Sequence, residues 1–149
     1  MCSAKVALLA FVVALSACGG GSDPAPKTEA EKRTEILTSG DATWTPATTA
    51  GVTVDGTDVT DELFPGFTIT FNDGTYTTSG TSPVWPAQDT WRFKDESATV
   101  IIRGSDEKEV TITQISATQL TLTLDWPLTT TKSGRSNSLK GKHVFTLNN

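Results

Sequence analysis

After Gly40, hydrophobic and polar residues alternate along most of the chain, and this two-residue period is typical of β-strands with one buried face. Residues 67–71 (FTITF) and 120–124 (LTLTL) show the pattern most clearly, because threonine separates successive apolar residues. A first strand is expected around Trp44, continuing with a break after Pro46 to Val54. The remaining strands are expected at 67–71, 75–79, 91–93, 99–103, 110–115, 120–124 and 142–147.

The connections between these strands favour an antiparallel arrangement. Asn72-Asp73-Gly74 is a tight turn typical of a hairpin, and no helix long enough for a parallel crossover separates any two strands. Eight short strands of this kind can close on themselves, which removes exposed edges. The sequence therefore predicts an all-β fold, an eight-stranded antiparallel up-and-down barrel over residues 41–149.

Apolar residues that share one phase along the strands are expected to point into the barrel. An eight-stranded barrel is only just wide enough for its own side chains, and several of these are aromatic, so we expect a packed interior rather than a large cavity. Tyr76 is expected to point inward as well, with its hydroxyl near one end. The inward set is Phe67, Ile69, Phe71, Trp91, Phe93, Val100, Ile102, Val110, Ile112, Leu120, Leu122, Leu124, Phe145 and Leu147.

Residues 28–40, directly before the barrel, favour a short helix. Thr28 and Glu31 have the spacing of a capping box, which satisfies free amide groups in the first turn of a helix. Gly40 then suits the end of the helix. Residues 18–27 mix glycine, proline and polar residues, and we expect them to form a flexible tether.

The first 18 residues indicate where the protein is sent. Lys5 precedes the apolar run 6–15, which is too short to span a bilayer, so residues 1–17 are expected to be a signal peptide. Residues 15–18 (LSAC) resemble the lipobox of bacterial lipoproteins, in which the cysteine is acylated. By this resemblance Cys18 carries lipid chains such as palmitate and attaches the protein to a membrane. An ordinary secretory signal ending beside a cysteine is the alternative.

The residue after the acylated cysteine bears on which membrane holds the protein. In lipoproteins of this kind an aspartate directly after the cysteine commonly retains them at the inner membrane, and Gly19 stands at that position here. The resemblance therefore implies the outer membrane.

Several motifs in the barrel region are similar to those of the lipocalin-like lipoproteins of Bacteroidetes. They are the segment 71–76 (FNDGTY), Trp91-x-Phe93, the LTLTL strand, and Leu139-Lys140-Gly141 leading to Phe145-x-Leu147, after an acylated cysteine and a short helix. The resemblance implies an eight-stranded barrel and a small apolar ligand. It brings no catalytic residue.

Long connections are expected to gather at one end of the barrel, because alternate connections of a meander lie at the same end. The three longest, residues 55–66, 80–88 and 125–141, all belong to that end. Since the chain enters the first strand at the opposite end, the end with long connections is expected to point away from the membrane.

Four side chains are candidate ligand-binding residues, and two of them, Trp85 and Trp126, are expected at the end with long connections. Trp85 and Trp126 each precede a proline in a long connection, and their rings would stack on a sugar or hold an apolar ligand. Alternatively, each ring folds back to cover the barrel mouth. His143 shares the inward phase of Phe145, and Tyr76 completes the set.

Composition argues against several other functions. The net charge of −5 disfavours nucleic acid as a partner. One histidine and two cysteines cannot build a zinc cage, and the acidic run 55–62 lacks the ligand spacing of a calcium loop. No motif pairs a nucleophile with His143. We therefore expect no metal, no cofactor and no enzymatic activity.

Together these features predict a lipid-anchored outer-membrane protein whose barrel binds a small apolar molecule, a glycan or another envelope protein at its distal rim. The alternative is a structural accessory subunit of an envelope complex, with a solid core and no small ligand.

Overall fold

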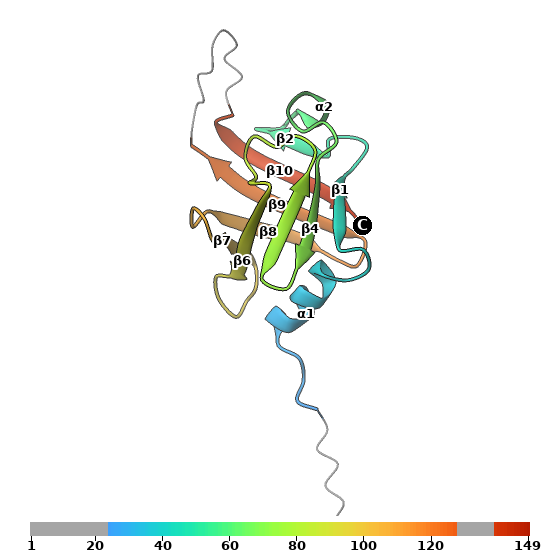
Figure 1. Ribbon diagram of the computed structural model, residues 1–149, viewed down its shortest axis with the longest axis vertical. Coiled ribbons are helices and arrows are strands. Elements are labelled where there is room, and N and C mark those ends of the chain that lie inside the picture. The colour runs from blue at the N-terminus through green and yellow to red at the C-terminus, as the bar shows by residue number, and fades with distance from the viewer. Residues whose placement is uncertain (1–23, 128–138) are drawn as a thin grey trace, which may run out of the picture.

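The computed structural model describes residues 24–127 and 139–149, which form a closed antiparallel barrel preceded by a short helix (Figure 1). The helices are α1 (Glu29–Leu37) and α2 (Thr60–Leu63). The strands are β1 (Thr43–Pro46), β2 (Val52–Val54), β3 (Thr57–Asp58), β4 (Thr68–Asn72), β5 (Thr75–Ser79), β6 (Gln88–Phe93), β7 (Val100–Arg103), β8 (Glu109–Ile115), β9 (Gln119–Trp126) and β10 (Gly141–Asn148).

The sheet confirms the predicted eight-stranded meander. Its order is β1-β4-β5-β6-β7-β8-β9-β10, and the additional pairing of β1 with β10 closes the barrel. All of these pairs are antiparallel. Strand β2 also pairs with β10, and the two-residue strand β3 pairs with β2 beside the barrel wall.

β1 and β2 are two parts of one barrel strand, as the predicted break after Pro46 requires. Both pair with β10, and the chain between them makes a short excursion. The amide of Ala47 donates to the carbonyl of Thr146, and the amide of Thr146 donates to Gly51. A Cβ on Gly51 would lie 2.4 Å from the carbonyl oxygen of Ala47, so only glycine lets the strand resume this close to its interruption.

The barrel interior is packed, and most of the predicted inward set is buried there. Strand β7 is the exception. The register pairs Arg103 with Trp91 and Ile101 with Phe93, so Ile101 and Arg103 share the inward phase. The prediction that Val100 and Ile102 point inward is wrong, because residues 100–103 (VIIR) are apolar at successive positions and alternation cannot fix their phase.

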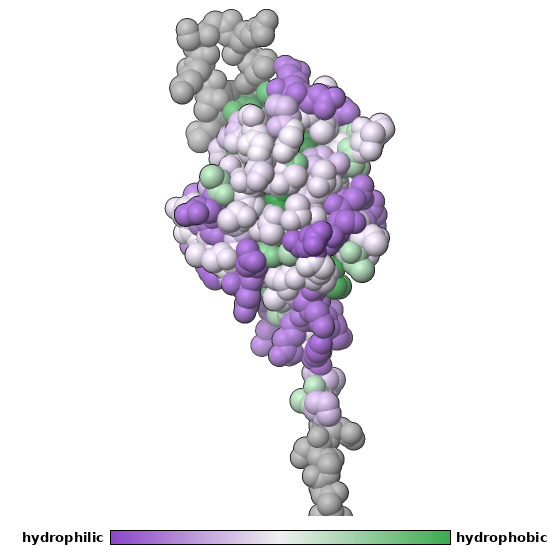
Figure 2. All heavy atoms as spheres, turned by 45° about the vertical axis from the view of Figure 1, so that its right-hand side comes forward, coloured by the Kyte–Doolittle hydropathy of each residue, from purple (hydrophilic) through white to green (hydrophobic). Residues whose placement is uncertain are grey.

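Outside the barrel, threonine covers much of the sheet. The face turned to the viewer in Figure 2 is mostly of intermediate hydropathy, with charged residues scattered over it. Cross-strand threonine pairs on the wall include Thr43 with Thr70, whose hydroxyl oxygens lie 2.9 Å apart, and Thr121 with Thr146. The alternation of threonine with apolar residues thus separates a polar wall from an apolar interior.

Helix α1 begins as predicted and stands under one end of the barrel (Figure 1). Thr28 and Glu31 form the capping box, with the amide of Glu31 donating to the Thr28 hydroxyl at 3.2 Å and the amide of Thr28 donating to the Glu31 carboxylate at 2.7 Å. The helix is joined to the barrel by Leu37, whose side chain is fully buried and whose carbonyl accepts from the Trp44 indole.

The two ends of the barrel differ in their connections. The helix end holds α1 and the turns at 72–74, 94–99 and 116–118. The loop end holds the connections 55–66, 80–87 and 104–108, together with the paired residues Trp126 and Gly141. This division matches the predicted one for the connections 55–66 and 80–88, whereas most of the third long connection, 125–141, falls outside the described residues.

Candidate ligand-binding site at the loop end of the barrel

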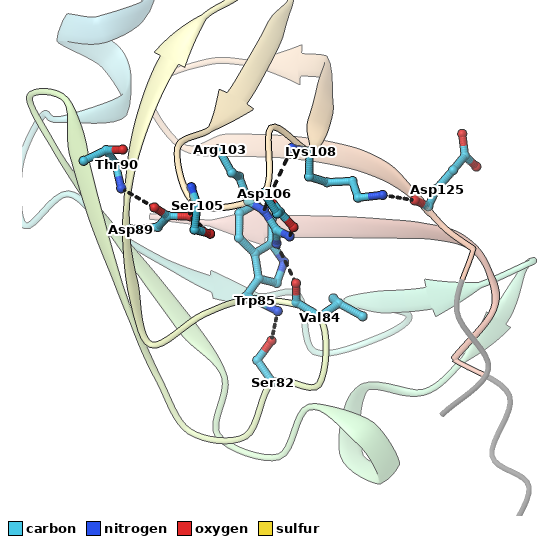
Figure 3. Close-up of polar contacts among 10 residues, drawn as sticks. All are labelled: Ser82, Val84, Trp85, Asp89, Thr90, Arg103, Ser105, Asp106, Lys108 and Asp125. Carbon is cyan, nitrogen blue, oxygen red and sulfur yellow. Dashed lines mark hydrogen bonds and ion pairs between the residues drawn. The ribbon is translucent and has the colours of Figure 1, made fainter. Parts of the chain in front are cut away.

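Trp85 lies inside the loop end and is only 4% exposed. Its indole meets Tyr76 edge-on at 5.4 Å and Phe145 at 5.8 Å between ring centroids. Its backbone amide donates to the Ser82 hydroxyl at 2.9 Å, which folds the connection 80–87 over the barrel (Figure 3). The ring therefore covers the barrel mouth, which is the second of the two arrangements expected from the sequence.

Gly80 starts this connection at a close crossing with the chain before β4. Its φ is 74°, and a Cβ there would lie 2.2 Å from the carbonyl oxygen of Gly66. A side chain at this position would be both strained and blocked, so the connection 80–87 needs glycine at its first residue.

Arg103 stands beside Trp85 and is 1% exposed, although it is charged. Its Nη1 donates to the carbonyl of Val84 at 2.5 Å, and its Nε donates to Asp106 Oδ1 at 3.1 Å (Figure 3). Its Nη2 also donates to the other oxygen of the Asp106 carboxylate. The guanidinium is thus paired with a carboxylate and tied to the backbone of the connection that carries Trp85.

The same guanidinium brings the two candidate tryptophans together. Its central carbon lies over the Trp85 ring at 5.4 Å and over the Trp126 ring at 5.7 Å. Trp126 is partly exposed, and the Lys108 ammonium lies 5.3 Å from its ring centroid. Both tryptophans therefore lie at the loop end, as the order of the meander predicts, and Arg103 is the residue that links them.

Sequence reasoning missed Arg103 because placing Val100 and Ile102 inward turns Arg103 to the outer face of the strand. One signal was available, since placing Trp91 inward and pairing it directly with Arg103 puts the arginine inward too. The exact pairing depends on the length of the turn at 94–99, which alternation alone does not determine.

Tyr76 and His143 both point inward, and the Tyr76 ring extends from the start of β5 between Phe71 and Trp85. Tyr76 is 1% exposed, and burial raises the pKa of its hydroxyl above the ordinary 10.0, outweighing the opposite effect of the nearby Arg103 charge. His143 is fully buried, stacks on Phe145 at 6.3 Å and meets Phe64 edge-on at 6.3 Å. Burial lowers the pKa of its imidazole, against the smaller influences of the Gly141 carbonyl and Asp55.

The tautomer of His143 follows from its one polar contact. Nδ1 lies 3.2 Å from the carbonyl oxygen of Gly141. In the neutral ring that the lowered pKa favours, Nδ1 carries the proton and donates to this carbonyl, so Nε2 is left as a hydrogen-bond acceptor.

Among the described residues, four buried side-chain atoms that can form hydrogen bonds have no partner. They are the Tyr76 hydroxyl, the indole nitrogens of Trp85 and Trp126, and His143 Nε2. These are the four side chains that the sequence singled out as candidate ligand-binding residues. Trp85, Trp126 and His143 lie at the loop end, and the Tyr76 ring reaches Trp85 from the start of β5. Together they offer two indole donors, one imidazole acceptor and a hydroxyl that can do either.

Three carboxylates lie around this site, those of Asp55, Asp89 and Asp106. Asp89 accepts from the Ser105 hydroxyl at 2.6 Å, and Asp55 accepts from the amide of Lys142 at 2.9 Å. Burial raises the pKa of Asp106, but the hydrogen bonds from Arg103, the amide of Lys108 and both positive charges together lower it below 3.8. Asp106 is therefore ionised at neutral pH and neutralises Arg103.

The acidic run at 55–62 has a structural role. Asp58 accepts from the amides of Thr60 and Ala50, each at 3.0 Å, and these bonds hold its pKa low. The hydroxyl of Thr60 also donates to Asp58, at 2.6 Å, at the start of α2. Across residues 24–127 and 139–149, no group of three or more metal-binding side chains comes together.

The anchoring residue lies elsewhere in the chain. Cys18 falls outside the described residues. So do residues 1–17, which are expected to form the signal peptide. No helix within the described part of the chain combines the length and the hydrophobicity needed to cross a bilayer.

Comparisons with protein-family models, with curated proteins and with solved structures gave no match.

Proposed function

We propose that the barrel binds a small molecule at its loop end, with Tyr76, Trp85, Trp126 and His143 as the contacting residues. One observation carries this proposal: the four buried polar atoms without a partner all belong to these side chains. Leaving such a group unpaired costs about 1–3 kcal/mol, so four of them favour a molecule that pairs with them.

The surroundings of these atoms suit binding rather than chemistry on a substrate. The walls are aromatic, with the rings of Phe64 and Trp85 against Phe145, and Trp126 lies on the other side of the Arg103 guanidinium. A few polar atoms are set among these rings. Mostly apolar walls with a few placed polar groups are typical of small-molecule sites. We propose a non-enzymatic binding protein on this basis.

Access to the site requires the connection 80–87 to move, because Trp85 is buried beneath it. This connection is held to the barrel by the bond from Arg103 to Val84, by the amide of Thr81 donating to Pro65, and by bonds from Thr78 to Pro86 and Ala87. Its opening breaks these bonds but leaves the pairing of the eight barrel strands in place, so it costs less than unfolding of the barrel.

We also propose that Cys18 carries lipid and anchors the protein to the outer membrane, the assignment that the lipobox and Gly19 favour. Helix α1 and its preceding residues then lie on the membrane side, and the loop end faces away. Replacing Cys18 with serine removes the thiol that accepts the lipid. Detergent-phase partitioning should then leave the variant in the aqueous phase or as precursor, and a mature Cys18→Ser protein that stays in detergent would contradict the anchor.

Native mass spectrometry of gently purified protein tests the binding function. The wild type should retain a small molecule, and Trp85→Ala should lose it. Thr121→Ala changes only the outer wall and serves as the matched control, which should retain it. If the wild-type protein is detected only at the mass of the chain without a bound molecule, the proposed function is wrong.

The second candidate function is a structural accessory subunit of an envelope complex. The observation that favours it is the tight packing of Phe64, Phe67 and Phe145 in the interior, with centroids 5.2 to 5.8 Å apart. A bare chain that copurifies with one membrane protein, in the same experiment, would favour this alternative.

A further inference from the structure

We infer that the molecule bound at the loop end is an uncharged saccharide. This inference rests on the proposed binding function and goes beyond it by naming the chemical class of the ligand. It follows from the hydrogen-bonding capacity of the unpartnered atoms, from the charge around them, and from the position of the one partly exposed ring.

The unpartnered atoms require a ligand that both accepts and donates hydrogen bonds. The two indole N–H groups can only donate, whereas Nε2 of neutral His143 can only accept. The Tyr76 hydroxyl can do either. Sugar hydroxyls are matched to such a set, since each one both donates and accepts. A purely apolar ligand would leave all four atoms unpaired.

The charges at the loop end disfavour an anionic ligand. Arg103, the only positive group buried among the described residues, is already paired with Asp106 and bonded to Val84. The Lys108 ammonium lies over the Trp126 ring and donates to the backbone carbonyl of Asp125 at 3.4 Å. Among the described residues, the Asp55 carboxylate lies near His143 and the Asp89 carboxylate near Tyr76, so an anionic ligand group bound to either side chain would meet a nearby negative charge.

A cationic ligand fits no better. An ammonium group only donates hydrogen bonds, and it would face two indole N–H groups that also only donate. It would also lie near the guanidinium that covers both tryptophan rings. An uncharged, polyhydroxylated molecule is what remains.

Trp126 is where such a molecule would first meet the protein. Its ring is partly exposed at the end of β9, whereas Trp85 is covered. The apolar faces of sugar rings pack against aromatic side chains, so the edge of a saccharide that reaches past Trp126 would arrive at the buried donors.

Binding of the full-length protein to an array of neutral and acidic saccharides, followed by calorimetric titration of the strongest neutral saccharide, tests the inference. We expect binding to neutral members and none to uronic or phosphorylated ones. Binding confined to acidic members overturns the inference. So does the absence of any binding up to about 10 mM, where even millimolar affinities are detectable.

The Tyr76→Phe variant makes the test specific to the site, because it removes one unpartnered hydroxyl and keeps the ring. Its affinity for the neutral saccharide should fall about five- to tenfold, the effect of one hydrogen bond between uncharged groups. Trp91→Phe is the matched control, since the Trp91 indole lies at the helix end and already donates to Asn72 and Thr75. Unchanged affinity in Tyr76→Phe would overturn the inference.

Failure of the ligand class and failure of the binding function give different results. If native mass spectrometry finds a retained molecule that is not a saccharide, the binding function stands and the ligand class is wrong. If the protein is bare and the array is blank, both are wrong.

Discussion

The two ends of the barrel each contain two tryptophans, and the two pairs differ in the hydrogen bonding of their indole N–H groups. At the helix end, the Trp44 indole donates to Leu37 at 3.2 Å, and the Trp91 indole donates to Asn72 at 2.9 Å and Thr75 at 3.0 Å. At the loop end, the indole nitrogens of Trp85 and Trp126 are buried without a partner. Tryptophan N–H groups therefore pair with backbone carbonyls at the helix end, whereas those at the loop end stay without an acceptor.

The difference in indole hydrogen bonding follows from the polar groups that each end contains. Short turns at the helix end leave carbonyl groups pointing inward, and the tryptophans use them. The loop end instead holds the buried guanidinium of Arg103, which is paired with the exposed carboxylate of Asp106, and the rings of Trp85 and Trp126 lie on this guanidinium. Unsatisfied groups gathered at one end are more typical of a site kept for function than of random packing defects.

The largest expected difference between the ends concerns removal of a whole indole. Trp44→Ala should cost about 3–5 kcal/mol of unfolding free energy, because the ring is fully buried and a cavity replaces it. Trp126→Ala should cost clearly less, because its ring is partly exposed. Urea unfolding of both variants measures this. Equal losses at the two positions would remove the structural distinction between the ends.

A finer comparison isolates the indole N–H group. Trp91→Phe removes an N–H group that donates to the carbonyls of Asn72 and Thr75, whereas Trp85→Phe removes an N–H group that has no acceptor. Since both changes reduce volume equally, Trp91→Phe should be less stable than Trp85→Phe by about 1–2 kcal/mol, the cost of carbonyls left unpaired. The midpoint of urea unfolding, at unchanged slope, reports the difference. If Trp85→Phe is the less stable variant, the indole at the loop end has a partner in solution.

The loop end should also respond to pH in a range where the helix end does not. Burial lowers the pKa of His143 below 6.5, so the unfolded chain takes up a proton first as the pH falls. Stability should be complete above pH 6.5 and decline below it, by at most about 1.4 kcal/mol per pH unit. His143 is the only histidine, so His143→Gln should abolish this decline. The carboxylates with lowered pKa values lose their contribution only in more acidic solution, below 3.8.

The smallest expected effect is on Tyr76, the only tyrosine in the chain. Its pKa is raised by burial, so the ultraviolet absorbance of tyrosinate should not appear at pH 10.0 while the barrel is folded. Tyr76→Phe should leave stability unchanged or raise it by up to about 1 kcal/mol, because it removes an unpaired buried hydroxyl. A loss of stability in that variant would mean that the hydroxyl is already paired within the protein.

The sequence predicted most of the barrel because its signals are local. Alternation around Leu122 assigns the inner face of β9, and the turn at 72–74 joins β4 to β5. The order of the strands then placed Trp85 and Trp126 at one end. The inward direction of Arg103 depends on the cross-strand register with Trp91, which is set by contacts between distant residues and not by the residues around 103. The partners of the indoles likewise depend on tertiary packing.

The interrupted first strand has a consequence for the order of events in folding. Both of its parts, β1 and β2, are held by β10, and Thr45 and Asn148 lie about a hundred residues apart in sequence. The strands from β4 to β9 can form successive hairpins early, but the ring cannot shut until β10 has been synthesised and brought back to β1. Joining such distant segments is slow because the intervening chain loses much freedom when its ends meet. Until that moment two strand edges remain open, which is when the molecule is most exposed to aggregation.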